Sequence, residues 1–300
     1  MSILEPEKPT ATTREQAPRG RVPSTINAED YHYLQDYVYR QSGIVLDHDK
    51  HYLMDARLAP IIRKAGFRNV ADLCNLLRGV TGGAPAGQIE AIKRDVVNAI
   101  TTNETFFFRE PAQYEALRKA VIPALMIQRK DTRRLRFWSA AASTGQEAYS
   151  LAMLLLDLGV EGWNVQITAT DLNDDVLAKA VQGKYGQIEV NRGLAPRHLL
   201  RYFNRAGLDW QVKEEVRRMV QFEQLDLRQC LRSRGPYDII FCRNVLIYFD
   251  IETKRRILSG MRGALYRGGY FLLGGAETTI NVDDQFRRVE VGGATLHQVA

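Results

Sequence analysis

Cysteine is scarce in this chain of 300 residues. The three cysteines, Cys74, Cys230 and Cys242, are odd in number, lie far apart and form no C-x-x-C pair. A disulfide framework or a structural zinc site needs paired or closely spaced cysteines, so neither is expected. No other cluster of metal-ligand type stands out, and we expect no metal site. A reducing, cytoplasmic environment fits this cysteine content.

Long apolar runs are missing as well. No stretch approaches the ~18 apolar residues of a membrane span, and the N-terminus lacks the apolar core of a signal peptide. We therefore expect a cytoplasmic protein without membrane insertion. Residues 1–25 hold four of the ten prolines and little hydrophobicity, so we expect a disordered tail. The net charge of +6 is consistent with an acidic partner and equally with ordinary solubility.

The remaining chain has enough apolar residues, 45% of the total, to form two domains. Over residues 26–100 apolar side chains recur every three to four positions, which predicts a small helical domain. The Gly/Pro-rich stretch 79–88 interrupts this pattern, and a last helix is expected at about 89–100. The segment TTNETFFFRE, residues 101–110, follows as a linker.

After Pro111 short apolar runs alternate with helical stretches, which predicts a mostly parallel sheet with helices on both faces. A hairpin closes the chain, because two short strands flank Gly292-Gly293. Residues 183–222 break the alternation and are expected to be an inserted subdomain, with a short helix at 194–203 and a strand-like stretch at 210–224. The expected strands are 134–140, 165–171, 237–244 and 268–275; the expected helices are 143–159, 173–181 and 251–266.

Two features at the ends of these strands suggest a bound nucleoside. The small residues at 138–145 would let a backbone approach a ligand closely, although a tight turn without a ligand explains them equally well. Asp171 ends a strand 26 residues after Gly145, where an acidic side chain commonly accepts hydrogen bonds from ribose hydroxyls. Asp171 could instead cap the following helix, but Asn173 or Asp174 could do that as well.

Two further segments carry candidate site residues. In FCRNVLIYFD, residues 241–250, Arg243 and Asn244 follow a buried strand and Tyr248 lies four residues on. The alternatives are solvation of a strand end and core packing of Tyr248. In the linker, three phenylalanines next to Arg109 could form an apolar pocket wall with a cation for a carboxylate, or a packing plug between domains with a surface arginine.

Five segments, in this order, resemble the CheR family of chemotaxis receptor glutamate methyltransferases: TTNETFFFRE, FWSAAASTGQEAYSLAM, ITATDLNDDVLAKA, YDIIFCRNVLIYFD and GGYFLLGGAE. The resemblance spans residues 28–295. It implies an all-α N-terminal domain (26–100, receptor docking) and a Rossmann-like S-adenosylmethionine-dependent methyltransferase domain (111–300), with a small antiparallel β-subdomain inserted at about 183–222. The linker 101–110 would contribute to the cofactor site.

The family's cofactor contacts are carried over to the matching positions of this chain. The resemblance implies that S-adenosylmethionine, or the product S-adenosylhomocysteine, is bound by Asn103, Thr105, Arg109, Glu147, Asp171, Asp226, Leu227, Arg243 and Asn244. Arg109 and Tyr248 correspond to residues thought to face the transferred methyl group and are the candidate catalytic residues. The chain departs from the family at Gln146 and Ala148, where Glu and Pro are usual, and at Ala141 and Ala142, where Gly and Cys are common. Alanine suits these last two positions if φ is negative there.

The resemblance also implies partners. The family's second helix is basic and is thought to contact the glutamate-rich methylation helices of the receptors. Here residues 50–68 carry five Lys/Arg and one acid, with Arg57 and Lys64 seven apart on one helical face, accompanied by Arg63 and Arg68. A solvated surface explains these charges equally well. The β-subdomain binds a receptor C-terminal peptide in some members, and the sequence leaves this open here. We expect a monomer.

Three other function classes fit the sequence less well. A nucleic-acid methyltransferase would fit the positive charge, but the chain lacks an N-P-P-Y-type motif and a basic stripe with interleaved aromatic residues, so no nucleic acid is expected as partner. An NAD-linked oxidoreductase would need the absent G-x-G-x-x-G. A receptor-binding module without activity would have lost the cofactor residues, and Glu147, Asp171, Arg243 and Asn244 are all present.

Overall fold

The computed structural model describes residues 26–48, 50–80 and 85–299. The expected disordered tail, residues 1–25, lies outside this range. The first unit is a bundle of four helices, α1 (Ala28–Ser42), α2 (His51–Ala65), α3 (Val70–Leu77) and α4 (Ala86–Ile100). Each buries its apolar stripe in one shared core, where Leu34, Leu58, Leu73 and Val96 are fully buried. The expected helical unit is confirmed, with its last helix beginning at Ala86 rather than at about 89.

Local chemistry sets the ends of α1. The Asn27 side chain accepts a hydrogen bond from the backbone N–H of Asp30, which satisfies a donor that the first turn leaves free. Gly43 ends the helix in the left-handed conformation, with φ of 75°. A side chain is also excluded at Gly43 by contact, because a Cβ there would lie 2.8 Å from Cδ of Arg228 in the second domain. The end of α1 is therefore packed directly against that domain.

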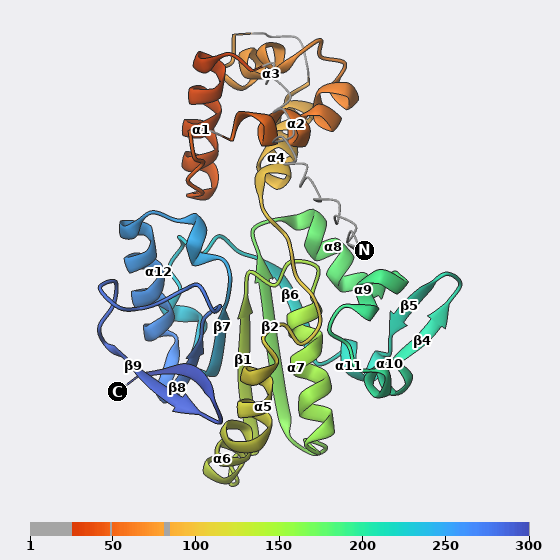
Figure 1. The fold of residues 1–300 in the computed structure, drawn as a ribbon, viewed down its shortest axis with the longest axis vertical. Helices are drawn as coiled ribbons and strands as arrows, with labels where there is room; N and C mark the ends of the chain where they lie inside the picture. Colours follow the sequence, from red (N-terminus) through yellow and green to blue (C-terminus); the bar gives the residue numbers. More distant parts are fainter. Residues whose placement is uncertain (1–25, 49, 81–84, 300) are drawn as a thin grey trace, which may run out of the picture.

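The second domain is built on a seven-stranded sheet in the order β6-β2-β1-β7-β8-β10-β9. The strands from β6 to β8 are parallel, and β10 and β9 form the antiparallel hairpin expected at the C-terminus. Figure 1 shows this sheet below the helical bundle. The strand bounds are β1 (Arg134–Ala140), β2 (Asn164–Asp171), β6 (Val220–Gln224), β7 (Tyr237–Cys242), β8 (Leu265–Leu272), β9 (Phe286–Val291) and β10 (Ala294–Val299).

Helices cover both faces of the sheet, and alternate residues of β1 show this. Leu135 and Phe137 enter one core, together with α5 (Pro111–Ala116), the π-helical turn η1 (Leu117–Val121), α6 (Ile122–Gln128) and α7 (Gln146–Asp157). Trp138 and Ala140 enter the opposite core with α12 (Ile251–Gly263). The helix expected at 251–266 is shorter than predicted, because Leu265 pairs with Tyr237 of β7 and so belongs to β8. The helix α8 (Asp174–Gln182) lies between β2 and the insertion.

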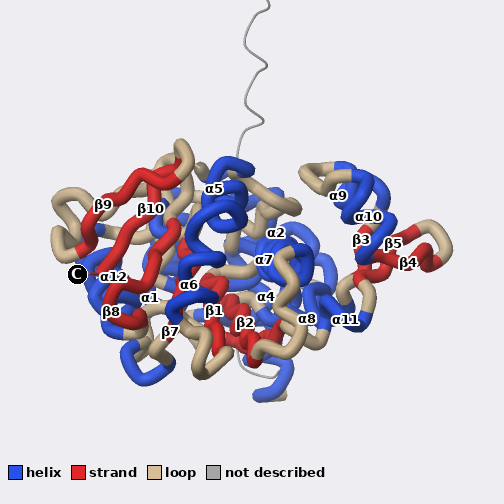
Figure 2. The backbone as a smooth tube through the Cα atoms, turned by 90° about the horizontal axis from the view of Figure 1, so that it is seen from below, coloured by secondary structure: helices blue, strands red, loops and turns tan. Residues whose placement is uncertain are grey.

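The insertion has its own three-stranded antiparallel sheet, ordered β3-β5-β4, which stands apart from the main sheet in Figure 2. It comprises β3 (Lys184–Tyr185), α9 (Gln187–Asn191), α10 (Pro196–Tyr202), β4 (Phe203–Ala206), β5 (Asp209–Val212) and α11 (Glu214–Arg217). One expectation was wrong here. Residues 210–224 are two strands separated by α11, and the second of them, β6, pairs in parallel with β2 of the main sheet. The expected boundary at about 222 therefore falls inside a main-sheet strand.

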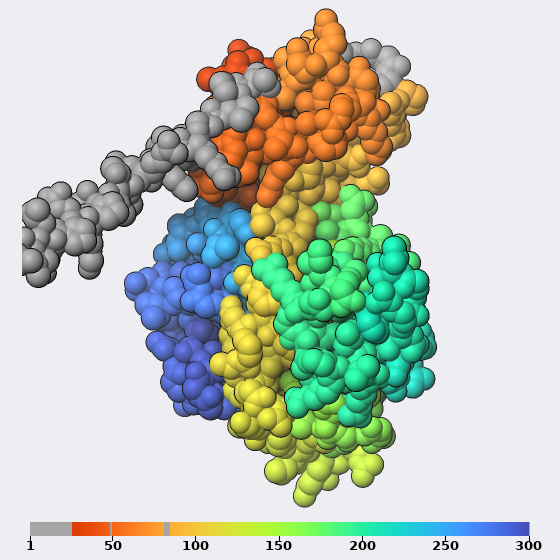
Figure 3. Space-filling model, turned by 45° about the vertical axis from the view of Figure 1, so that its right-hand side comes forward, coloured from red at the N-terminus to blue at the C-terminus, as the bar shows by residue number. Residues whose placement is uncertain are grey.

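The loop after α1 contacts the sheet domain directly through its backbone. The backbone N–H of Val45 donates to the carbonyl of Tyr248 at 2.9 Å, and Ile44 forms an isolated antiparallel bridge with Phe249. Tyr248 closes the short 3-10 helix η3 (Leu246–Tyr248), which follows β7. In Figure 3 the two domains are stacked, with the chain around residues 100–110 crossing the junction. The loop after α1 is thus held against the segment that carries Tyr248.

Candidate functional site

A cleft with an empty volume of about 910 Å³, partly open to solvent, lies where the parallel strands end under the helical bundle. Register explains why the strand-end residues meet there. Ala140 of β1 pairs with Thr170 of β2 and Cys242 of β7, so the next residues, Ala141, Asp171 and Arg243, leave the sheet at one level. The cleft is lined by all ten residues selected from the sequence: Asn103, Thr105, Arg109, Glu147, Asp171, Asp226, Leu227, Arg243, Asn244 and Tyr248.

The loop from β1 to α7 has an unusual backbone. Ala141, Ser143 and Gly145 all have positive φ, at 66°, 52° and 91°. Only glycine fits at 145, because a Cβ there would lie 2.9 Å from that of Ala180 and 3.1 Å from the Phe222 ring. The condition under which alanine suits position 141, a negative φ, is therefore not met. The alanine stands in a left-handed conformation that its methyl group makes unfavourable.

Asp171 holds the loops around the cleft. One carboxylate oxygen accepts from the N–H of Ser143 at 2.8 Å, and the other from the N–H of Asn173 at 3.0 Å. Burial raises the pKa of Asp171, and the backbone donors pull it in the opposite direction. Capping of α8, the alternative role for Asp171, belongs to Asn173, whose side chain accepts from the N–H groups of Asp175 and Val176.

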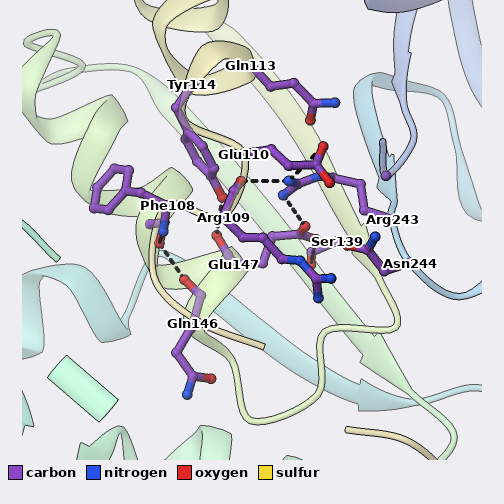
Figure 4. Close-up of polar contacts among 12 residues, drawn as sticks. Phe108, Arg109, Glu110, Gln113, Tyr114, Ser139, Gln146, Glu147, Arg243 and Asn244 are labelled. Atoms are coloured by element: carbon purple, nitrogen blue, oxygen red, sulfur yellow. Dashed lines mark hydrogen bonds and ion pairs between the residues drawn. The ribbon is translucent and has the colours of Figure 1, made fainter. Parts of the chain in front are cut away.

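A buried ion pair crosses the floor of the cleft (Figure 4). Arg243 donates to one carboxylate oxygen of Glu147 at 2.9 Å, and Ser139 donates to the other at 2.7 Å. The Arg243 guanidinium also donates to the carbonyl of Arg109 at 2.6 Å and lies 3.3 Å from the Glu110 carboxylate. Its Nε is buried without a hydrogen-bond partner among the described residues. Arg243 therefore ties strand β7 to helix α7 and to the linker.

Glu277 shapes the segment after β7, and sequence reasoning gave it no role. Its carboxylate accepts four backbone N–H bonds, from Asn244 at 2.6 Å, Val245 at 2.9 Å, Leu246 at 2.7 Å and Gly274 at 2.8 Å. This holds Asn244 at φ of 59°, in the left-handed region, at the edge of the cleft. The only signal in the sequence was the acidic end of GGYFLLGGAE, which names a residue without showing what it contacts.

The linker motif divides into a part that lines the cleft and a part that packs. Thr105 and Arg109 line the cleft, and the Arg109 guanidinium donates to the carbonyl of Glu104 at 3.1 Å. Phe107 is fully buried and meets Tyr185 and Phe203 of the insertion edge-on. None of the three linker phenylalanines, Phe106, Phe107 and Phe108, is among the residues that line the cleft. The packing alternative is therefore correct for Phe107, and the pocket-wall interpretation does not apply to it.

Asp226 and Leu227 follow β6 and face the cleft from the side of β2. The Asp226 carboxylate is held by Arg228, which donates from Nε at 3.0 Å and from Nη2 at 2.6 Å. The same guanidinium donates to the carbonyls of Arg40 at 3.1 Å and Gln41 at 2.5 Å at the end of α1. Arg228 thus connects a cleft residue with the helical bundle, a role that the sequence did not suggest.

The basic segment 50–68 is mostly engaged in the fold. Arg57 donates to the carbonyls of Ile100 and Thr101, where α4 ends. Lys64 pairs with Asp95 of α4 at 2.9 Å, and Arg68 with Asp72 at 2.9 Å. Arg63 is exposed, without an ion pair among the described residues. Arg57 is therefore a structural residue, and reversing its charge would disturb the bundle itself.

Comparisons with known proteins cover most of the chain. The family model of the CheR methyltransferase all-alpha domain matches residues 29–85, and that of the CheR methyltransferase SAM-binding domain matches residues 103–293. Chemotaxis protein methyltransferase 1 of Pseudomonas aeruginosa is 38% identical over 281 residues, covering 92% of this chain and 99% of its own length. The chemotaxis protein methyltransferase of Vibrio parahaemolyticus is 36% identical over 280 residues, covering 92% and 98%.

Solved structures give a weaker likeness. The glycopeptide N-methyltransferase MtfA in complex with S-adenosyl-L-homocysteine is 18% identical, covers 67% of this chain and 62% of its own, and has a TM-score of 0.34. A score this low supports no argument about function. Within the described residues, no helix is both long and apolar enough to cross a membrane.

Proposed function

The chain belongs to the CheR methyltransferase family, and from this premise we propose that it methylates glutamate side-chain carboxylates of chemotaxis receptors. Family membership makes it an S-adenosylmethionine-dependent methyltransferase of chemotaxis. The carboxylate acceptor and the roles of individual residues are the proposal. The observation that carries it is the single cleft into which the fold brings ten residues from five separate segments.

The residues of the cleft fit the cofactor. Asp171 keeps acceptor capacity beyond its two backbone bonds, which supports its proposed role as acceptor for ribose hydroxyls. Asp226 and Leu227, on the β6 side, suit the adenine, with a carboxylate for its amino group and an apolar contact for its ring. The Arg243 guanidinium lines the cleft and suits the carboxylate end of the cofactor. The acidic lining, which includes Glu104 and Glu147, suits its sulfonium charge.

The proposed reaction needs no general acid or base from the protein. S-adenosylmethionine supplies a methyl group on a sulfonium, which is a good leaving group. A glutamate carboxylate, with an ordinary pKa of about 4.3, is already an anion at neutral pH, so no general base is needed. The protein must place this anion in line and remove its water. Arg109 can pair with the carboxylate, and Tyr248 can donate a hydrogen bond to it, because both line the cleft.

The proposed acceptor can be tested by its product. Wild-type protein is incubated with S-adenosylmethionine labelled in the methyl group and with membranes that carry a chemotaxis receptor. A glutamate methyl ester releases its label as volatile methanol in mild alkali, whereas a methylated amine does not. We expect alkali-labile label in the receptor, and none when the methylated glutamates are replaced by alanine. Alkali-stable label, or label in added DNA instead of receptor, contradicts the proposal.

Tyr248→Phe tests the proposed catalytic role. The ring stays in place through its packing, and the backbone contact between Val45 and the Tyr248 carbonyl is unaffected. Loss of the hydroxyl is expected to lower kcat roughly tenfold or more, the effect of one hydrogen bond to a charged group, without changing cofactor affinity. Tyr266→Phe, outside the cleft lining, is the control. Full turnover of Tyr248→Phe would restrict Tyr248 to packing.

A further inference from the structure

Four large apolar side chains are exposed where the helical bundle meets the sheet domain. Tyr39 and Val45 come from the end of α1 and the loop after it; Ile247 and Ile251 come from η3 and the start of α12. Each is between 44 and 48% exposed. We call these four residues the mouth seam. Isolated exposed apolar residues need no explanation, but a group of four from two segments distant in sequence does.

Hydrogen bonds between the two segments make the mouth seam one surface at the edge of the cleft. The Tyr39 hydroxyl donates to the Asp250 carboxylate at 2.9 Å, next to Ile251. The N–H of Val45 donates to the carbonyl of Tyr248, next to Ile247. Tyr248 itself lines the cleft. In Figure 1 the lower end of α1 approaches α12 at this place. A chain bound on the mouth seam would therefore lie beside the proposed catalytic tyrosine.

A second feature continues this surface with positive charge. A shallow open hollow with an empty volume of about 1240 Å³ is lined by Arg228, Arg232, Arg255 and Arg256, and we call it the arginine hollow. Arg255 lies one helical turn after Ile251 on α12, and Arg228 lies 3.4 Å from the Tyr39 carbonyl to which it donates. Glu252, paired with Arg255, is the one acidic residue in the lining of the hollow. The two features are thus adjoining parts of one face.

Most cations of the segment 50–68 already have partners within the helical bundle. Arg57 donates to carbonyls at the end of α4, and Lys64 and Arg68 form exposed ion pairs with Asp95 and Asp72. Arg256, by contrast, contacts only the Thr253 hydroxyl one turn back, at 3.3 Å, in the hydrogen bonds of the described residues, and Arg232 donates to Ser259 at 3.1 Å. Both guanidiniums keep donors for a further acceptor.

We propose that the target segment of the substrate, an acidic amphipathic helix, docks across the mouth seam with its carboxylates over the arginine hollow. This proposal rests on the proposed function, because it specifies where that substrate binds. An apolar seam buries one stripe of a helix, and the flanking arginines match glutamates on its sides. The glutamate that points past Ile247 then reaches the cleft at Tyr248. The arginine charges speed encounter and fix the orientation of the helix, while the seam contributes most of the affinity.

Two double variants separate the two contributions. Val45→Ser with Ile251→Ser removes apolar surface, and Arg255→Glu with Arg256→Glu reverses charge; none of these side chains lines the cleft. Matched controls lie near the opposite end of the sheet: exposed Ile127→Ser, and Lys130→Glu with Arg134→Glu. The readouts are the KM for receptor membranes, kcat, and the affinity for S-adenosylhomocysteine in calorimetry.

We expect the apolar double variant to raise KM roughly tenfold, in proportion to the exposed area removed, at any salt concentration. The charge-reversal variant should raise KM at low salt, with the effect shrinking toward 1 M salt, where the Debye length is about 3 Å. Cofactor affinity and both controls should match wild type. Wild-type KM in both variants, with a wild-type enzyme that methylates receptor, overturns the docking proposal alone. A wild-type enzyme that does not methylate receptor overturns the proposed function instead.

Discussion

A single methyl group can be tested at Ala141, at the residue scale. Its φ of 66° places the backbone in the left-handed region, a conformation that costs an L-residue roughly 1–2 kcal/mol because Cβ crowds the following carbonyl oxygen. Ala141→Gly removes this cost but adds freedom to the unfolded chain, so we expect stabilisation by up to about 1 kcal/mol in urea unfolding. The neighbouring Ala142→Gly is the control. Ala142 is buried and is not among the positive-φ residues, so Ala142→Gly should destabilise the protein. Equal effects at both sites would contradict the argument.

Glu277 provides a second test at this scale. Glu277→Ala leaves four backbone donors without their acceptor and should lower the free energy of unfolding by roughly 2–4 kcal/mol. Glu277→Gln keeps one acceptor oxygen, so its free energy of unfolding should fall by about half as much as that of Glu277→Ala. Because Asn244 lines the cleft, affinity for S-adenosylhomocysteine should fall in the same order, measured by calorimetry. Exposed Glu290→Ala should change neither quantity. A stable Glu277→Ala protein with full affinity would show that the segment after β7 keeps its conformation without Glu277.

Part of the cleft could be predicted from the sequence for a physical reason, whereas residues such as Asn103, Glu147 and Asp226 were implied only by the resemblance to the CheR family. The ends of parallel strands meet at one edge, so Asp171 and Arg243 could be brought together from strand order alone. Glu277 and Arg228 escaped notice because their partners are backbone groups of distant segments: N–H groups after β7, and carbonyls at the end of α1. Backbone groups leave no residue-type signal. The positive φ at Ala141 was missed for a similar reason, since alanine seldom adopts it.

At the scale of elements, α10 is fixed to α7 by one carboxylate. Asp157 accepts from the Tyr202 hydroxyl at 2.5 Å and from Arg201 at 2.9 Å, and lies 2.9 Å from Nε2 of His198. Burial alone would raise the pKa of Asp157, but the hydrogen bonds from Tyr202 and His198 outweigh it and lower the pKa. The contribution of Asp157 is therefore present above its ordinary pKa and is lost as pH falls through the lowered value.

Asp157→Ala should loosen the inserted subdomain. Buried His198 and Tyr202 lose their acceptor, which should cost about 2–3 kcal/mol of stability, measured by thermal unfolding at pH 7. The cleft lining does not include α10, so affinity for S-adenosylhomocysteine should stay at the wild-type value. Exposed Glu161→Ala is the control. The difference between Asp157→Ala and wild type should narrow in acid, and a difference independent of pH would contradict the assigned role.

The assignment of β6 to the insertion was wrong because β6 is an edge strand. Its residues are half-buried or exposed, whereas Ile239 and Ile240 of the central strand β7 are fully buried. A central parallel strand is recognisable as a continuous apolar run, but an edge strand has polar residues on one face and resembles a strand of a small antiparallel sheet. β6 is identified as part of the main sheet only by its parallel pairing with β2, which runs from Ile167 opposite Val220 to Asp171 opposite Gln224.

At the scale of the whole molecule, Arg228 is one of the residues that join the two domains, together with Tyr39, Val45 and Asn98. It reaches carbonyls of Tyr39, Arg40 and Gln41 while it holds Asp226 at the cleft. A helix end with three carbonyls carries partial negative charge, and a fork of donors satisfies several of them at once. The Arg228 guanidinium therefore links the end of α1 to the proposed adenine end of the cleft.

Arg228→Ala should affect both domains together. The Asp226 carboxylate loses its partner, and affinity for S-adenosylhomocysteine should fall roughly tenfold, the value of one hydrogen bond between charged groups. The helical bundle should become less tightly held, which would appear as a larger radius of gyration in X-ray scattering. Arg228→Lys keeps the charge near Asp226 but cannot span the same carbonyls, so it should restore most of the affinity and little of the compactness. If both variants keep wild-type affinity and scattering, the backbone contacts of Ile44 and Val45 with the η3 segment suffice to join the domains, and Arg228 does not couple them.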